Sequence, residues 1–254
     1  MRRAFPLVLT VALAACSSGA VSTPLSTTDT TPPPSTPPSQ ASPRPPRTSP
    51  EPSASPVSAL PSGVPPSFAG DVPAAQVPAS ALIPPGTEAT GTWYGRTSAG
   101  DAIVVAWEAP GPNPLRVDRG VVVWRRFADD GAPWRPVLGT AFAADTTPVL
   151  GLDATVQDVT GDGSDDVLLF ASTGGSGACG TYAVLDLAAG TRIYRRRVCD
   201  AEVVASSQPV GLTITEAVYA AGDAHCCPSS YRQTVIVYGA DGTWHTASTR
   251  VRPT

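Results

Sequence analysis

Short runs of apolar and β-branched residues, separated by Gly, Asp and Pro, fill the chain from about residue 86 to its C-terminus. They have the length and composition of strands, and none carries a helical apolar period over a dozen positions. The pattern therefore predicts an all-β domain of antiparallel sheets, such as a small sandwich. The expected strands are Thr92–Arg96, Ile103–Glu108, Gly120–Phe127, Thr155–Val159, Val167–Ala171, Gly180–Leu187, Arg192–Val198, Leu212–Tyr219, Thr234–Tyr238 and Trp244–Thr249.

Turn-forming dipeptides lie between several of these strands. They are Asp130-Gly131, Ala189-Gly190 and Asp241-Gly242. The clearest alternation of apolar and polar side chains occurs over residues 212–218, which predicts a strand with one face more buried than the other.

The hairpin around Ala189-Gly190 can be aligned residue by residue. A three-residue loop ending at Gly190 gives this glycine the left-handed conformation that a G1 bulge needs. The same register places Cys179 opposite Cys199, although neither cysteine was used to choose it, and so predicts a disulfide across the hairpin. The pairs expected nearest the turn are Leu187–Thr191, Asp186–Arg192, Leu185–Ile193 and Val184–Tyr194.

The remaining cysteines of this region, Cys226 and Cys227, are adjacent and follow His225. They can bridge each other in a strained ring, or each can bridge to one hairpin cysteine. Free thiols, intermolecular bridges or a metal site with His225 are further alternatives. An even number of cysteines in the folded part suits disulfides in an oxidising compartment.

The first fifteen residues have the pattern of an export signal. Arg2 and Arg3 precede a short apolar segment, Phe5–Ala15, which is too short to span a bilayer. The sequence Leu13-Ala14-Ala15-Cys16 resembles the lipobox of bacterial lipoproteins. That resemblance implies removal of residues 1–15, lipidation of Cys16 and attachment to the outer side of the cell membrane. The alternative is an ordinary secretory signal in which Cys16 is incidental.

Composition changes sharply along the chain. Most of the 29 prolines lie between Cys16 and Gly86, whereas all five Trp and all six Tyr come later. A segment rich in Pro, Ser, Thr and Ala buries too little apolar surface to offset its ordering entropy. We therefore expect residues 16–85 to be a disordered linker and spacer, followed by one extracytoplasmic domain over residues 86–254.

The charge of the chain excludes one class of partner. The formal net charge is -4 and the sequence contains no lysine, so there is no basic block of the kind that nucleic-acid binding requires. The one cationic cluster, Arg195-Arg196-Arg197, falls on an expected strand, where successive side chains alternate between faces. It is interpreted as a charge-paired surface, with an anion site as the alternative.

The segment from Asp158 to Asp166 has the pattern of a calcium-binding loop. Ca²⁺ prefers six to eight oxygen ligands held by a tightly turned backbone. Side chains at alternate positions of a turn can point inward, and Gly163 stands where the chain must reverse. The candidate ligands are Asp158, Thr160, Asp162, the carbonyl of Ser164, and Asp166, with Asp165 pointing the other way.

This loop resembles the calcium loops of FG-GAP and VCBS repeats, which occur in integrin-like propellers and bacterial surface proteins. The resemblance covers about fifteen residues and implies Ca²⁺ ligation by Asp158, Asp162 and Asp166, with Thr160 standing where the family has Asp or Asn. The resemblance also implies a partial propeller-like domain as the alternative to a small sandwich. The sequence contains one good copy, so no propeller-specific function is implied. The alternative is a loop whose side chains bond only their own backbone.

These features favour a non-catalytic surface protein. The expected function is binding, adhesion or envelope structure, with partners that include the membrane through the N-terminal lipid and a protein or carbohydrate ligand. The alternative is an extracytoplasmic hydrolase, for example one acting on carbohydrate, that uses a pair of carboxylates from Glu108, Glu202, Glu216 or the Asp residues. The run Gly174–Ala178 lacks the final Gly of a nucleophile elbow and is interpreted as a surface loop.

Overall fold

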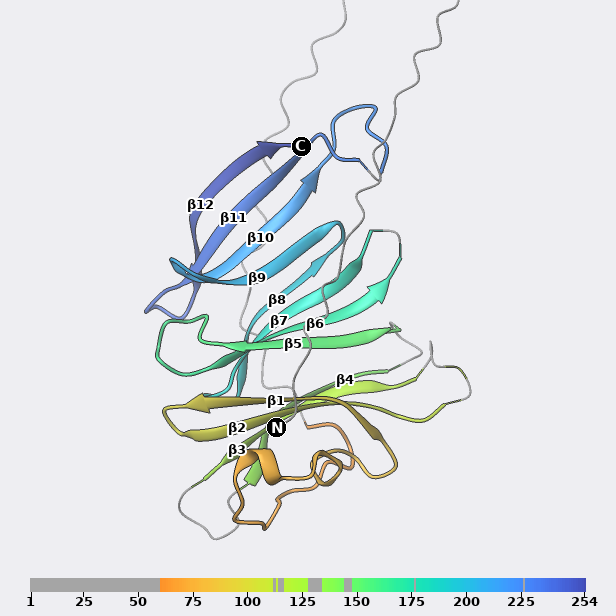
Figure 1. The fold of residues 1–254 in the computed structure, drawn as a ribbon, viewed down its shortest axis with the longest axis vertical. Coiled ribbons are helices and arrows are strands. Elements are labelled where there is room, and N and C mark those ends of the chain that lie inside the picture. Colours follow the sequence, from red (N-terminus) through yellow and green to blue (C-terminus); the bar gives the residue numbers. More distant parts are fainter. Residues whose placement is uncertain are drawn as a thin grey trace, which may run out of the picture. The chain divides into compact units, whose positions relative to one another are not determined.

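A computed structural model of the protein describes residues 60–111, 113, 117–127, 134–143, 148–175, 177–225 and 227–254. Within these residues the chain forms twelve strands in three antiparallel four-stranded sheets (Figure 1), which confirms the predicted all-β class. Sheet 1 contains β1 (Glu88–Thr97), β2 (Gly100–Glu108), β3 (Arg119–Arg126) and β4 (Trp134–Phe142). Sheet 2 contains β5 (Gly151–Gln157), β6 (Asp166–Gly174), β7 (Cys179–Asp186) and β8 (Thr191–Val198). Sheet 3 contains β9 (Ala201–Ser207), β10 (Val210–Val218), β11 (Ser230–Tyr238) and β12 (Trp244–Pro253).

Each sheet is a meander whose strands pair in sequence order, and the sheets stack face to face. Side chains such as Val104 and Val123 of sheet 1 pack with Leu169 of sheet 2 in one core. Leu168 on the other face of sheet 2 packs with Leu212 of sheet 3 in a second core. Three stacked meanders correspond to the propeller-like alternative of the prediction.

The central strands of sheets 1 and 2 are buried on both faces, which explains their continuous apolar sequences. In β2, Val104 enters the core shared with sheet 2, while Ile103 and Val105 enter a core on the opposite face. In β10 only one face is covered: Leu212 and Ile214 are buried. The alternation expected for this strand is therefore confirmed.

The segment before β1 corrects the predicted domain boundary. Residues 60–85, expected to be linker, form two 3-10 turns, η1 (Ala74–Gln76) and η2 (Ala79–Ala81), and cover the outer face of sheet 1. Leu82 and Ile83 are buried there, and the indole of Trp124 donates a hydrogen bond to the Leu82 carbonyl at 2.9 Å. The composition of this segment is typical of disorder, but its few large apolar residues complete a core.

Two strands were not expected from the sequence. β4 contains Pro136, which cannot donate to a sheet ladder. It is tolerated because β4 is the edge of sheet 1 and the register shifts beside Pro136, between Val123 and Trp124 of β3. β9 is also an edge strand. Val203 is its one buried side chain, so the sequence of β9 carries only a weak pattern of apolar residues.

The β7–β8 hairpin corrects the predicted register near the turn. Asp186 pairs with Thr191 and Leu185 with Arg192, so the pairs expected nearest the turn are wrong by one residue. The loop has four residues, and Ile193 is an extra residue of β8 that forms a bulge. Beyond the bulge Val184 pairs with Tyr194 as predicted.

Several predictions fall on residues that the structure does not describe. The signal segment 1–15, Cys16 and the linker up to residue 59 lie outside the described part of the chain, as do the Asp130-Gly131 turn, Ser176 and Cys226.

Candidate functional site

The predicted calcium loop joins β5 to β6 in sheet 2. It runs from Asp158 to Asp165, and Asp166 is the first residue of β6. Gly161 and Gly163 have φ values of 80° and 82°, which side chains rarely adopt, so these two glycines permit the tight turn. The structure therefore has a loop at this segment and a positive φ at Gly163, as the sequence pattern predicted, whereas the second turn position, Gly161, was not predicted.

The carboxylate of Asp158 lies inside the loop and accepts backbone hydrogen bonds. Its Oδ1 accepts from the Gly161 amide at 2.6 Å and its Oδ2 accepts from the Gly163 amide at 3.0 Å. In the same way, Oδ1 of Asp162 accepts from the Ser164 amide at 2.7 Å. Both carboxylates stabilise the turn through its own amide groups.

Asp166 is the buried acid of the site, with 1% of its surface exposed. Its Oδ2 accepts from the Val159 amide, the Thr160 amide and the Thr160 hydroxyl at 3.0–3.1 Å. Its Oδ1 is buried and has no hydrogen-bond partner among the described residues. Burial raises the pKa of Asp166 from 3.8 to about 7, and the charge of Asp186 acts in the same direction, whereas the hydrogen bonds oppose the rise.

The loop is also fixed to sheet 1. Asp165 points away from the other carboxylates, as expected, and its Oδ2 accepts from the Arg96 amide at 2.7 Å. The Asp165 amide donates to the Arg96 carbonyl at 2.7 Å, and the buried hydroxyl of Ser164 accepts from the Ser98 amide at 3.1 Å. The loop thus joins β5 and β6 to β1 and the turn that follows it.

The structure brings three of the candidate ligands together, because the Thr160 hydroxyl lies 3.0 Å from Asp166 Oδ2 and 3.5 Å from Asp158 Oδ1. Among the described residues, no group of three or more His, Cys, Asp or Glu side chains is arranged to hold a metal ion. Asp158 and Asp162 face amide groups, and the buried Oδ1 of Asp166 has no hydrogen-bond partner among the described residues. The arrangement suits a turn whose carboxylates bond its own amide groups, and each carboxylate keeps further lone pairs that a cation could use.

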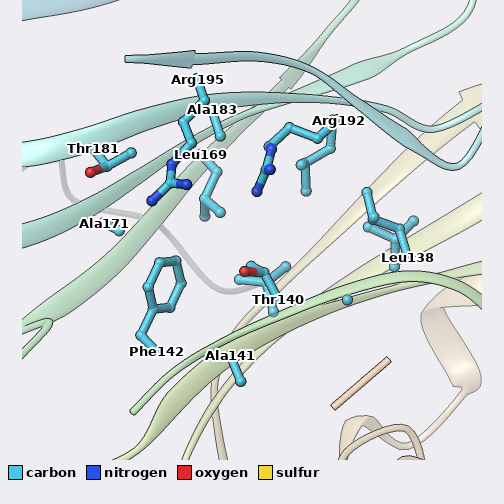
Figure 2. Close-up of a pocket in the computed structure, with 14 residues that line it drawn as sticks. Leu138, Thr140, Ala141, Phe142, Leu169, Ala171, Thr181, Ala183, Arg192 and Arg195 are labelled. Carbon is cyan, nitrogen blue, oxygen red and sulfur yellow. The ribbon is translucent and has the colours of Figure 1, made fainter. Parts of the chain in front are cut away.

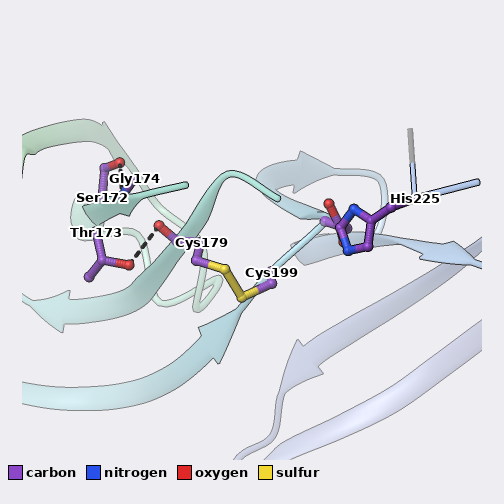
Figure 3. The surroundings of a disulfide bond; sticks show 7 residues. Ser172, Thr173, Gly174, Cys179, Cys199 and His225 are labelled. Carbon is purple, nitrogen blue, oxygen red and sulfur yellow. Dashed lines mark hydrogen bonds and ion pairs between the residues drawn. A yellow bond between two sulfur atoms is a disulfide. The ribbon is translucent and has the colours of Figure 1, made fainter. Parts of the chain in front are cut away.

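The predicted disulfide between Cys179 and Cys199 is confirmed (Figure 3). It closes the open end of the β7–β8 hairpin, where the Cys179 carbonyl accepts a hydrogen bond from the Thr173 hydroxyl at 3.1 Å. This bridge excludes the arrangements in which Cys226 or Cys227 pairs with a hairpin cysteine. Cys227 is exposed, and a bridge between Cys226 and Cys227 stays a prediction.

The three glutamates considered for hydrolysis do not form one pair. Glu108 lies on β2 and forms an ion pair with Arg119 at 3.1 Å. Glu202 pairs in register with Thr215, so Glu216, the next residue of β10, lies on the opposite face of sheet 3. Three carboxylates are thus divided between two sheets and two faces.

Sequence reasoning missed a cavity between sheets 1 and 2. The cluster Arg195-Arg196-Arg197 is divided by the structure: Arg196 forms an ion pair with Glu216, whereas Arg195 lines the cavity together with Arg192. The bulge at Ile193 changes which side chains share a face, and no sequence signal located that bulge.

Comparisons with known proteins identify no relative. No protein-family model, curated protein or solved structure matches the chain. Within the described residues, no helix is long and apolar enough to cross a membrane. The resemblance of this loop to FG-GAP and VCBS calcium loops therefore stays a prediction from the sequence.

Proposed function

We propose that the chain is a lipid-anchored extracytoplasmic protein whose β-domain binds a protein or carbohydrate of the cell envelope and catalyses no reaction. The observation that carries this proposal is the Cys179–Cys199 disulfide, because such bridges persist in oxidising compartments outside the cytosol. The lipobox-like segment ending at Cys16 supports the same location independently. The acyl chains attached at Cys16 hold the protein at the membrane, because each buried methylene contributes about 0.8 kcal/mol.

Lipidation is tested by comparing the natural chain with the variant Cys16→Ser in a bacterial host that processes lipoproteins. The natural chain is expected to enter the detergent phase on phase partition and to incorporate a labelled fatty acid. Cys16→Ser is expected to incorporate none, because the acceptor thiol is absent. An unlabelled natural chain that stays in the aqueous phase contradicts the proposal.

We also propose that the Asp158–Asp166 loop binds Ca²⁺ and that the ion stabilises the turn rather than taking part in chemistry. The support is the set of oxygen ligands and the unpartnered buried oxygen of Asp166. Millimolar Ca²⁺ is expected to raise the melting temperature, and Asp162→Ala is expected to remove this response. Asp153→Ala is the matched control, since Asp153 lies outside the loop on β5. An unchanged melting temperature in the natural protein removes the calcium proposal.

A further inference from the structure

A cavity of about 200 Å³ lies between sheets 1 and 2, beside the strands β3, β4, β6, β7 and β8 (Figure 2). Its walls are mainly apolar and include Val123 and Leu138 of sheet 1 and Leu169 and Leu185 of sheet 2. An apolar cavity of about 150 Å³ is large enough to hold a benzene molecule. The space therefore suits a small ring or a short hydrocarbon chain.

Two arginines of β8 point into this cavity (Figure 2). Arg192 and Arg195 are three positions apart, so in a regular strand they would lie on opposite faces. The extra residue Ile193 places both on the face toward sheet 1, since Arg192 pairs with Leu185 and Arg195 with Ala183. The bulge thus brings two guanidinium groups to one side of an apolar cavity.

Neither guanidinium is neutralised by the described residues around it. The described lining includes no Asp, Glu or His, and its other polar side chains are the hydroxyls of Thr140 and Thr181. Burial lowers the pKa of Arg192, and the charge of Arg195 lowers it further. By contrast, Arg119, Arg126 and Arg196 form ion pairs with Glu108, Asp71 and Glu216. Two like charges at an apolar cavity are unfavourable without an anion.

We propose that this cavity binds a small organic monocarboxylate with an apolar body about the size of a benzene ring. The planar guanidinium groups of Arg192 and Arg195 match the geometry of a carboxylate, and the apolar walls take the hydrocarbon part. Arg195 is exposed, so the charged end of the cavity reaches solvent. A bare inorganic anion would leave the apolar walls without a partner. This site is independent of the proposed membrane anchor and of the calcium loop.

Binding is tested by titration calorimetry of the purified protein with phenylacetate. Phenylacetamide has the same shape without the charge, and inorganic phosphate has the charge without the apolar body. Saturable binding of phenylacetate is expected, with affinities at least about tenfold weaker for the two comparison compounds. Absence of saturable heat with phenylacetate, or equal binding of the amide or of phosphate, overturns the proposal.

Variants locate the site on the molecule. Arg192→Gln and Arg195→Gln are each expected to weaken phenylacetate binding at least about tenfold. Arg197→Gln removes the same charge from the same strand, but Arg197 does not line the cavity, so its affinity is expected to stay within about twofold. Near-ultraviolet circular dichroism verifies that each variant is folded. Equal losses in all three variants indicate a general charge effect and overturn the site.

Discussion

Asp166 is the residue at which burial and charge conflict most directly in the described structure. One of its oxygens accepts three hydrogen bonds, whereas the other is buried without a partner. Because burial raises its pKa to about 7, the folded protein binds a proton at this carboxyl more tightly than the unfolded chain does. Protonation at Asp166 therefore stabilises the folded state at low pH, and this contribution is complete below the unfolded pKa of 3.8.

The expected pH dependence follows from that difference. As the pH rises from about 4 to about 7, the contribution of Asp166 to the free energy of unfolding is expected to decrease. Asp166→Asn keeps the shape of the side chain and removes the titration, so its stability is expected to change less over this range. Urea denaturation of both proteins at several pH values, in the presence of a chelator, measures the difference. Parallel pH profiles for the two proteins contradict this account of Asp166.

Among the structural elements, the β7–β8 hairpin shows how far a sequence pattern predicts register. The pairs beside the turn were wrong by one residue because the loop has four residues rather than three. The bulge at Ile193 adds one residue to β8 and compensates for this error, so the register is correct from Val184 to the disulfide. Bulges depend on packing between sheets, and a single strand sequence does not specify them.

The disulfide gives a prediction for this hairpin. Replacing Cys179 or Cys199 by Ser is expected to lower the free energy of unfolding by about 3 kcal/mol, because the unfolded chain regains the entropy of an open loop. The double variant is expected to lose no more than either single variant, since each substitution already removes the bridge. Urea denaturation measures the three values. Losses that add up in the double variant contradict a bond between these two cysteines.

At the scale of the whole molecule, a layer that composition did not predict covers sheet 1. Residues 60–85 carry the proline-rich composition of a linker, yet Val77, Leu82 and Ile83 are buried against sheet 1. The all-β class was predictable because strand runs and turn residues are local signals. The domain boundary was not predictable from the sequence, because residues 60–85 are ordered by the surface that they cover. That surface forms only when strands distant in the sequence have paired.

This layer is tested by a pair of leucine variants. Leu82 is fully buried, so Leu82→Ala is expected to lower the free energy of unfolding by about 3 kcal/mol through the cavity it leaves. Leu60, with 42% of its surface exposed, is the matched control and is expected to change it by less than about 0.5 kcal/mol. Tryptophan fluorescence during urea denaturation reports the transition, since Trp124 contacts Leu82. Equal effects of the two variants contradict the packing described for residues 60–85.

The central claim, that this β-domain is held outside the cell by lipid on Cys16, is tested most directly by the mass of the mature N-terminus. Mass spectrometry of the protein purified from membranes of its native host is expected to show a chain that begins at Cys16 and carries added acyl groups. A chain that retains Met1 or begins at another residue, with an unmodified Cys16 thiol, contradicts the claim.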